Sequence, residues 1–333
     1  MRLRVGVLGA GSWGTTVAAL ASHNAPTTLW ARSAELAAEI DERHTNQRYL
    51  PSVTLPASLR GTASVEACVR DADVVVMGVP SHGFRAVLAD VKEHIRPWVP
   101  VISLAKGLEE GSYLRMTQVI ESVLPGHPAG VLTGPNLARE IMAGYAAGAV
   151  VAMEDETIVR ELQRLFTCRL YRVYTNRDVV GCELGGALKN VMAIAAGMGD
   201  GLGVGDNTRA AVITRGLAEL TRLGVAMGGA PATFAGLAGM GDLVATCSSR
   251  QSRNRYVGEQ VGKGRKIDEI VAEMHMVAEG VKTSRVVMEL AERHGVPMPI
   301  AREVFGVCWE GRTAEQAYRG LLRTEARGED EPG

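Results

Sequence analysis

The sequence has 333 residues, 46% of them hydrophobic and 22% charged, which is typical of a globular protein of about two domains and excludes wholesale disorder. Its 36 basic and 37 acidic side chains leave a formal net charge of -1, so the basic surface needed to bind a nucleic-acid backbone is missing. Glycine is frequent, with 39 residues, which indicates close approaches of the backbone to other groups.

The first half of the chain alternates short apolar runs with segments of helical periodicity. Strands separated by helices predict an α/β domain built around a parallel sheet. The expected strands are 3–8, 27–31, 74–79, 101–104, 130–132, 149–152 and 170–173. The expected helices of this half are 13–22, 34–43, 83–94 and 114–123.

A glycine-rich turn follows the first strand. Gly9, Gly11 and Gly14 stand between that strand and the first helix, and a second strand follows about 13 residues later. The first glycine suits a tight turn, the second admits a pyrophosphate close to the backbone, and the third permits close helix packing. In this context the spacing predicts dinucleotide binding, with an ordinary strand-to-helix turn as the alternative.

The end of the second strand favours NADPH over NADH. Enzymes that use NAD commonly place Asp or Glu there to hold the ribose 2′-hydroxyl. This sequence has Arg32, which could bind a 2′-phosphate through two hydrogen bonds. The alternative is a solvated surface arginine.

Two further turns follow strands of the predicted sheet. Lys106 comes directly after the run 101–104, and the segment 133–140 follows the strand at 130–132 and begins a helix. Open α/β sheets bind ligands at the carboxyl ends of their strands, so these turns are expected to converge on one crevice. The alternative is that both are ordinary strand-exit turns.

Strand signals stop near residue 178, and the rest of the chain is predicted to be helical. The boundary between two unlike domains is a common place for a ligand cleft. The expected helices are 182–198, 208–223, 254–262, 267–275, 280–294, 299–309 and 314–322. The residues after 323 are expected to form a disordered polar tail.

Lys189 lies on the first of these helices among small residues. Gly185, Gly186, Ala193 and Ala196 are three, four and seven positions away, on the same side of the helix. They leave room for a substrate beside the amine, or for another backbone beneath a surface lysine. Two glycines inside a helix cost about 1 kcal/mol each, which indicates a packing or functional reason.

A polar stretch from 239 to 255 is expected to form a loop that leads into a helix. Its hydroxyl and guanidinium groups, including Ser252 and Arg253, are the donors that a small phosphate needs. The alternative is a hydrophilic surface loop.

Cysteine and histidine positions argue against a metal and against secretion. The five cysteines are scattered and odd in number, and no two of the seven histidines lie within five residues of each other. We expect a cytoplasmic protein with reduced thiols and no metal site. Residues 5–31 carry no charge, but glycines, His23, Asn24 and Pro26 interrupt them, so the chain is expected not to be membrane-embedded.

Taken together, these motifs closely resemble the bacterial type of NAD(P)-dependent glycerol-3-phosphate dehydrogenase. The resemblance rests on segments 9–14, 105–107, 134–136, 183–190, 239–242, 252–254 and 278–280, in this order along almost the whole chain. It implies an α/β Rossmann-type dinucleotide-binding domain over residues 1–178 and an all-α substrate domain over 179–323, followed by the tail 324–333. It also implies the reversible reduction of dihydroxyacetone phosphate to sn-glycerol 3-phosphate, the backbone precursor of phospholipids.

The resemblance implies roles for particular residues. Lys189 would be the proton donor and acceptor. The phosphorylated substrate would contact Lys106, Gly134, Asn136, Lys189, Asp242, Ser252, Arg253 and Asn254. The cofactor, NADP or alternatively NAD, would contact Gly9, Gly11, Ser12, Trp13, Gly14, Arg32, Lys106, Ala138, Arg253, Val277 and Glu279. Relatives often carry Ser or Thr where this sequence has Asn136, and a homodimer is what the family suggests.

Two rival interpretations remain open from the sequence. One is a dehydrogenase of the same architecture that acts on a hydroxyacyl or sugar-acid substrate, which would not need the cluster at 252–254. The other is a sensor or scaffold that binds a dinucleotide without catalysis, in which Lys189 would be incidental.

Overall fold

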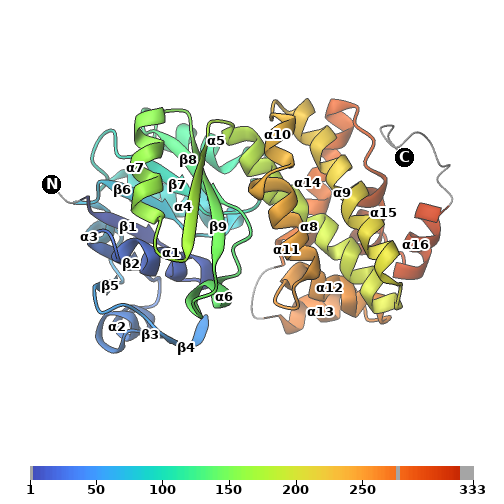
Figure 1. The fold of residues 1–333 in the computed structure, drawn as a ribbon, viewed down its shortest axis with the longest axis horizontal. Helices are drawn as coiled ribbons and strands as arrows, with labels where there is room; N and C mark the ends of the chain where they lie inside the picture. The colour runs from blue at the N-terminus through green and yellow to red at the C-terminus, as the bar shows by residue number, and fades with distance from the viewer. Residues whose placement is uncertain (1–2, 275–277, 323–333) are drawn as a thin grey trace. The chain divides into compact units, whose positions relative to one another are not determined.

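The computed structural model describes residues 3–274 and 278–322 (Figure 1). The chain divides into two compact units between Val179 and Val180. The first unit is α/β and the second is all-α, as the sequence predicts. Val277 and the tail 324–333, for which the sequence analysis made predictions, lie outside the described residues.

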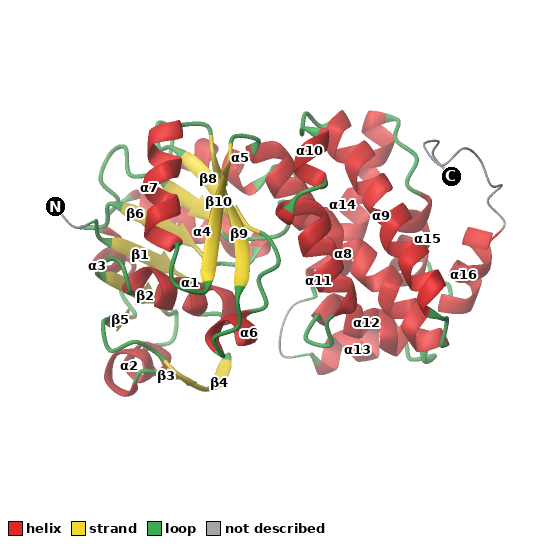
Figure 2. Cartoon of the chain, in the orientation of Figure 1, coloured by secondary structure: helices red, strands yellow, loops and turns green. Residues whose placement is uncertain are grey.

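The first unit is built on an eight-stranded sheet, in yellow in Figure 2. Its order is β10-β9-β8-β7-β6-β1-β2-β5. The strands are β1 (Val5–Leu8), β2 (Thr27–Trp30), β5 (Leu59–Thr62), β6 (Val74–Met77), β7 (Val101–Ser103), β8 (Ala129–Thr133), β9 (Ala147–Met153) and β10 (Tyr171–Asn176), and a separate ribbon pairs β3 (Thr45–Asn46) with β4 (Leu50–Thr54).

Helices cover both faces of this sheet. Successive residues of a strand point to opposite faces, so Val5, Val7 and Val76 pack in one apolar cluster while Leu8 and Val75 pack in the other. The helices of the first cluster are α1 (Ser12–Ser22), α2 (Ala34–Ala38), the π-helical turn η1 (Glu39–Arg43), α6 (Ala138–Met142) and α7 (Glu156–Phe166). Those of the second cluster are α3 (Val65–Val69), α4 (Ser81–Lys92) and α5 (Met116–Val123).

All seven strands expected from the sequence are present, but the sheet is not wholly parallel. Strand β9 pairs antiparallel with β8, and β10 pairs parallel with β9. The cause is the short connection 134–146. It has 13 residues, at the lower limit of the dozen or more that a parallel crossover needs, and its helix α6 rises only about 7.5 Å against about 16 Å for β8, which favours an antiparallel return.

The sequence analysis did not predict strand β5 or helix α7. Strand β5 lies at the sheet edge and contains Arg60 and Gly61, so it lacks an apolar run. Helix α7 is amphipathic and begins after Asp155, whose carboxylate accepts from the backbone N–H groups of Thr157 and Ile158.

The second unit consists of helices in its described residues (Figure 2). They are α8 (Val179–Leu202), α9 (Asp206–Ala226), α10 (Pro231–Phe234), the π-helical turn η2 (Leu237–Gly241), α11 (Asp242–Ser248), α12 (Arg253–Gly262), α13 (Ile267–Glu273), α14 (Glu279–His294), α15 (Pro299–Trp309) and α16 (Ala314–Leu322).

Helix α8 is the core helix of the second unit. Every residue from 181 to 198 is buried. Among the described residues α8 alone is long and apolar enough to cross a membrane, but 94% of its apolar window is buried inside the protein. Burial in the protein core therefore accounts for its apolar composition.

The expected loop at 239–255 is wrong for most of its length. Residues 237–248 form η2 and α11, and only 249–252 connect to α12. Asp242, Leu243, Thr246 and Cys247 are buried, and their spacing is that of one helical face. The two glycines and several hydroxyl residues gave this segment the composition of a loop. For that reason the helical spacing of its four buried residues was not recognised in the sequence.

A buried carboxylate joins α9 to the start of α15. The Glu219 carboxylate accepts from the backbone N–H of Ile300 at 2.7 Å and of Ala301 at 3.2 Å, which caps α15. Burial raises the pKa of Glu219 to about 7, although these hydrogen bonds oppose the rise.

Candidate active site

The glycine turn of the first unit has the geometry of a dinucleotide cradle. Gly9 adopts a φ of 111°, which side-chain-bearing residues rarely adopt, and a Cβ on Gly14 would lie 2.0 Å from the carbonyl oxygen of Gly9. The Cβ position of Gly11 has no protein atom within 4 Å, so that side of the turn is open. Helix α1 begins at Ser12 without a side-chain cap, which leaves its first N–H groups for an anion.

This turn lies where the strand order changes direction. Strand β1 pairs with β2 on one side and with β6 on the other, which makes its carboxyl end the switch point of the sheet. Gly78 follows β6, and its Cβ would lie 3.0 Å from the Cα of Gly14. The two strand ends therefore approach closely, as a pyrophosphate site at a switch point requires.

Arg32 stands just past the end of β2 and is exposed. The described part of the chain offers it no hydrogen-bond or ion-pair partner. Its guanidinium is therefore available to a 2′-phosphate. Ser12 has a defined partner, because its hydroxyl donates to the carbonyl oxygen of Tyr49 at 2.8 Å.

Two predicted substrate residues of the first unit meet directly. The Lys106 ammonium, after β7, donates to the carbonyl oxygen of Gly134, after β8, at 2.7 Å. Gly134 has a φ of 124°, and its Cβ would lie 3.1 Å from the Cα of Ala149. Ala138 is the first residue of α6.

Three buried polar atoms near these turns lack a partner in the described residues. They are Trp13 Nε1, Thr133 Oγ1 and Asn136 Nδ2. Buried polar atoms are almost always satisfied in folded proteins, so these three atoms are available to hydrogen-bond a ligand or water at the predicted binding segments. Trp13 and Asn136 thus fit the cofactor and substrate roles that the resemblance implies.

Lys189 is buried in a polar cluster of the second unit and is not a surface lysine. Its side chain is 6% exposed. The ammonium lies 3.1 Å from Asp242 Oδ1 and donates to Thr246 Oγ1 at 2.5 Å. The Thr246 hydroxyl in turn donates to the backbone carbonyl of Asp242 at 2.6 Å. A charged amine is thereby held in one position inside the unit.

A glycine on α8 brings this cluster together. Gly185 lies one turn before Lys189, and a Cβ there would lie 2.6 Å from the carbonyl oxygen of Ala238. The absence of a side chain lets η2 rest on α8. Helix α11 follows η2 directly in the chain. The contact between η2 and α8 therefore places Asp242 and Thr246 of α11 beside Lys189. The small residues around Lys189 therefore serve a close backbone approach that supports the polar site.

Asn254 extends the cluster to two more helices. Its amide nitrogen donates to Asn190 Oδ1 at 2.9 Å, and its amide oxygen accepts from the backbone N–H of Gly280 at 2.9 Å. Asn190 follows Lys189 directly, so α8, α12 and α14 share one buried polar region. The structure therefore places Lys189 beside Asp242 and joins Asn254 to Asn190, the next residue on α8. The substrate roles that the resemblance implies for them stay predictions.

The start of α12 presents the other predicted phosphate contacts. Ser252 caps the helix by accepting from the backbone N–H of Arg255 at 3.2 Å. Arg253 is the first residue of α12. Burial of its guanidinium lowers its pKa, and the negative charge of the Glu279 carboxylate at the start of α14 opposes this shift. This pair places Arg253 and Glu279, both predicted cofactor contacts, close together.

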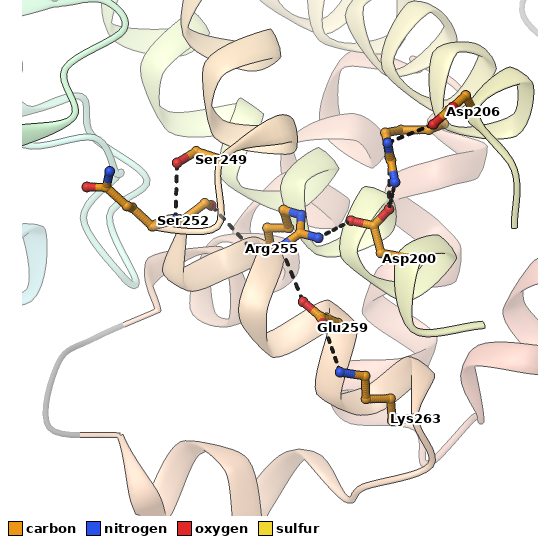
Figure 3. A network of polar contacts seen from close by, with 9 residues as sticks. Asp200, Asp206, Ser249, Ser252, Arg255, Glu259 and Lys263 are labelled. Carbon is orange, nitrogen blue, oxygen red and sulfur yellow. Dashed lines mark hydrogen bonds and ion pairs between the residues drawn. The ribbon is translucent and has the colours of Figure 1, made fainter. Parts of the chain in front are cut away.

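A network of ion pairs holds α12 in place through residues that follow Arg253 along the helix (Figure 3). Arg255 binds Asp200 of α8 at 2.6 Å and Glu259 at 3.2 Å, and Glu259 binds Lys263 at 2.6 Å. Asp200 also binds Arg209 of α9 at 2.5 Å. Arg255 and Asp200 are mostly buried, so the network fixes the start of α12 against α8 and α9.

The described residues contain no group of three or more His, Cys, Asp or Glu side chains that could hold a metal ion.

Sequence reasoning missed Thr246 and Tyr171. Thr246 is four residues after Asp242, a helical spacing that could have revealed it had 242–248 been interpreted as a helix. The Tyr171 hydroxyl donates to Asn136 Oδ1 at 3.2 Å across 35 residues of sequence, and no local pattern signals that contact.

Comparisons with known proteins agree with this geometry. The model of the N-terminal domain of NAD-dependent glycerol-3-phosphate dehydrogenase matches residues 4–159, and the model of its C-terminal domain matches residues 178–319. The chain belongs to this family.

Its relatives match over nearly their full length. The chain is 64% identical over 333 residues to glycerol-3-phosphate dehydrogenase [NAD(P)+] 2 of Sphingopyxis alaskensis, covering 100% of each chain. It is 59% identical over 320 residues to glycerol-3-phosphate dehydrogenase [NAD(P)+] 1 of Mycobacterium tuberculosis, covering 96% of this chain and 94% of the relative. The crystal structure of glycerol-3-phosphate dehydrogenase from Coxiella burnetii superposes with a TM-score of 0.92 at 35% identity, covering 97% and 99% of the two chains.

Proposed function

We propose that this chain catalyses the reversible, NAD(P)H-dependent reduction of dihydroxyacetone phosphate to sn-glycerol 3-phosphate, which supplies the backbone precursor of phospholipids. Family membership over the whole chain supports the reaction. The observation that carries the proposal is the buried Lys189 ammonium, held by Asp242 and Thr246.

Lys189 is the proposed acid and base. A bound NAD(P)H supplies a hydride to the C2 carbonyl carbon of the substrate. The Lys189 ammonium stabilises negative charge on the carbonyl oxygen and donates the proton that completes the hydroxyl group. Asp242 and Thr246 hold the amine in position until the proton moves. In the reverse direction the neutral amine accepts the hydroxyl proton.

The remaining substrate contacts are proposed to hold the phosphate and the hydroxyl groups. They are Lys106, Gly134, Asn136, Asp242, Ser252, Arg253 and Asn254. Arg253 is the side chain best suited to the phosphate, because it begins a helix and carries a planar pair of donors. Binding of the phosphate remote from C2 positions the carbonyl group for reaction.

The cofactor is proposed to occupy the open side of the glycine turn. Gly9, Gly11, Ser12, Trp13 and Gly14 would surround the pyrophosphate. The other proposed contacts are Arg32, Lys106, Ala138, Arg253, Val277 and Glu279. The free and exposed Arg32 favours NADPH, with NADH as the second substrate.

We further propose that the enzyme is a cytoplasmic homodimer. Its five cysteines are all free thiols, which suits a reducing compartment. The dimer follows from the family resemblance, and light scattering on the purified chain measures the molecular mass that decides it.

The decisive experiment is a steady-state assay of NADPH and NADH oxidation with dihydroxyacetone phosphate. We expect rapid turnover that requires the phosphorylated substrate. Unphosphorylated dihydroxyacetone, a hydroxyacyl thioester and a sugar acid serve as comparison substrates. Turnover of one of these in preference would favour a different dehydrogenase, and cofactor binding without any oxidation would favour a non-catalytic sensor.

A further inference from the structure

In the Asn136 carboxamide the oxygen atom has a hydrogen-bond partner and the nitrogen atom has none among the described residues. Its oxygen accepts from the Tyr171 hydroxyl at 3.2 Å. Its nitrogen is buried and has no acceptor within the described chain. Asn136 lies two residues after Gly134, whose carbonyl oxygen accepts from Lys106. An amide nitrogen with free donors therefore lies in the same strand-end segment as Gly134, which is joined to Lys106, and both of these are proposed substrate contacts.

Tyr171 is held rigidly enough to set the orientation of this amide. It is the first residue of β10 and is 1% exposed. Its backbone exchanges hydrogen bonds with Cys168 at 3.0 and 3.2 Å. Its ring lies 6.3 Å from the ring of Trp13, tilted by 57°, a favourable aromatic arrangement. Burial raises the pKa of Tyr171, so the phenol stays a donor at every pH at which the enzyme is assayed.

The orientation matters because the two ends of a carboxamide have opposite hydrogen-bonding characters. The substrate presents oxygen atoms from its phosphate, carbonyl and hydroxyl groups. The amide nitrogen can donate to these oxygens, whereas the amide oxygen would repel the phosphate and carbonyl oxygens. A phenol that donates to the amide oxygen leaves the nitrogen on the open side.

We propose that Tyr171 is a positioning residue for the substrate: its hydroxyl holds the Asn136 carboxamide with the nitrogen toward the substrate oxygens. This inference rests on the proposed function. Tyr171 itself touches Asn136 and Trp13, and its effect on the substrate passes through the amide.

The first test is Tyr171→Phe, which removes the hydroxyl and keeps the ring against Trp13. We expect the KM for dihydroxyacetone phosphate to rise about three- to ten-fold, the effect of one weakened hydrogen bond. The kcat and the KM for NADPH should stay within about two-fold, because neither Lys189 nor the glycine turn is altered. The matched control is Tyr174→Phe on the same strand, where the side chain is half exposed and all constants should match the wild type.

A double-mutant cycle separates positioning from general weakening of the fold. Asn136→Ala should raise the KM about ten-fold, and adding Tyr171→Phe to it should raise the KM no further, since the hydroxyl would act on an amide that is gone. Additive effects would overturn the inference. An unchanged KM in Tyr171→Phe would overturn it as well.

Asn136→Asp provides a test that leaves Tyr171 intact if the phenylalanine variant does not fold. The substitution keeps an oxygen for the phenol and replaces the nitrogen by a second, negatively charged oxygen. We expect a larger rise in KM than for Asn136→Ala, and an unchanged KM would refute the outward-facing nitrogen. A wild-type protein without activity on dihydroxyacetone phosphate would instead refute the proposed function.

Discussion

Replacing Lys189 by Met should separate catalysis from stability in the polar cluster. Methionine has a similar length and no charge, so the substitution removes the ammonium and leaves little space. The Asp242 carboxylate, 2% exposed, would lose a positive charge 3.1 Å away. With an effective dielectric constant of about 20, the attraction across 3.1 Å is about 5 kcal/mol, and breaking a buried pair usually costs about 3–5 kcal/mol.

We expect Lys189→Met to lower kcat by about 10²–10⁴, the range for loss of a general acid. We also expect its free energy of unfolding in urea to fall by about 3 kcal/mol. The double variant Lys189→Met with Asp242→Asn removes both charges. It should recover most of the stability and none of the activity, because the proton donor is still missing.

Lys263→Met is the matched control. Lys263 also pairs with a carboxylate, but its side chain is 51% exposed, so the loss should be about 0.5 kcal/mol with activity unchanged. The reasoning fails if Lys189→Met keeps kcat within a few-fold of the wild type. It also fails if the double variant is less stable than the single one.

Three further predictions test the cofactor, the phosphate and the pH dependence of stability. Arg32→Ala should raise the KM for NADPH about ten-fold or more and leave the KM for NADH nearly unchanged; equal changes would exclude a 2′-phosphate contact. Arg253→Ala should raise the KM for dihydroxyacetone phosphate at least ten-fold, with the exposed Arg250→Ala as control, and an unchanged KM would show that the phosphate binds elsewhere. Because the pKa of Glu219 rises on folding from 4.5 to about 7, its contribution is fully present below pH 4.5 and is lost as the pH rises through 7. This rise in the pKa corresponds to about 3 kcal/mol of stability. Urea unfolding between pH 5 and 8 should show the fall in the wild type and none in Glu219→Gln.

Local sequence patterns were enough to predict much of the fold and part of the candidate site. Six of the seven expected strands are mostly buried apolar runs, which differ plainly from the helices between them, and β10 alternates buried and exposed residues, as a half-buried strand does. The glycine turn could be recognised because tight backbone geometry permits few residues other than glycine. Lys189 stood out because it was surrounded by small side chains on a helix.

Contacts between distant segments could not be predicted in this way. The antiparallel turn at β9 depends on the short α6 connection, and the pairing of Tyr171 with Asn136 spans 35 residues. The composition of 239–248 even pointed to a loop, because its buried stripe becomes visible only when the helix rests on α8.

Local sequence patterns were enough to single out the groups of the proposed site: the glycine turn, Arg32 and Lys189. Packing alone revealed that Lys189 is buried beside Asp242 and Thr246, and that Asn136 Nδ2 has no acceptor among the described residues. Burial and hydrogen-bond partners depend on packed neighbours, and these come from parts of the chain that local periodicity does not connect.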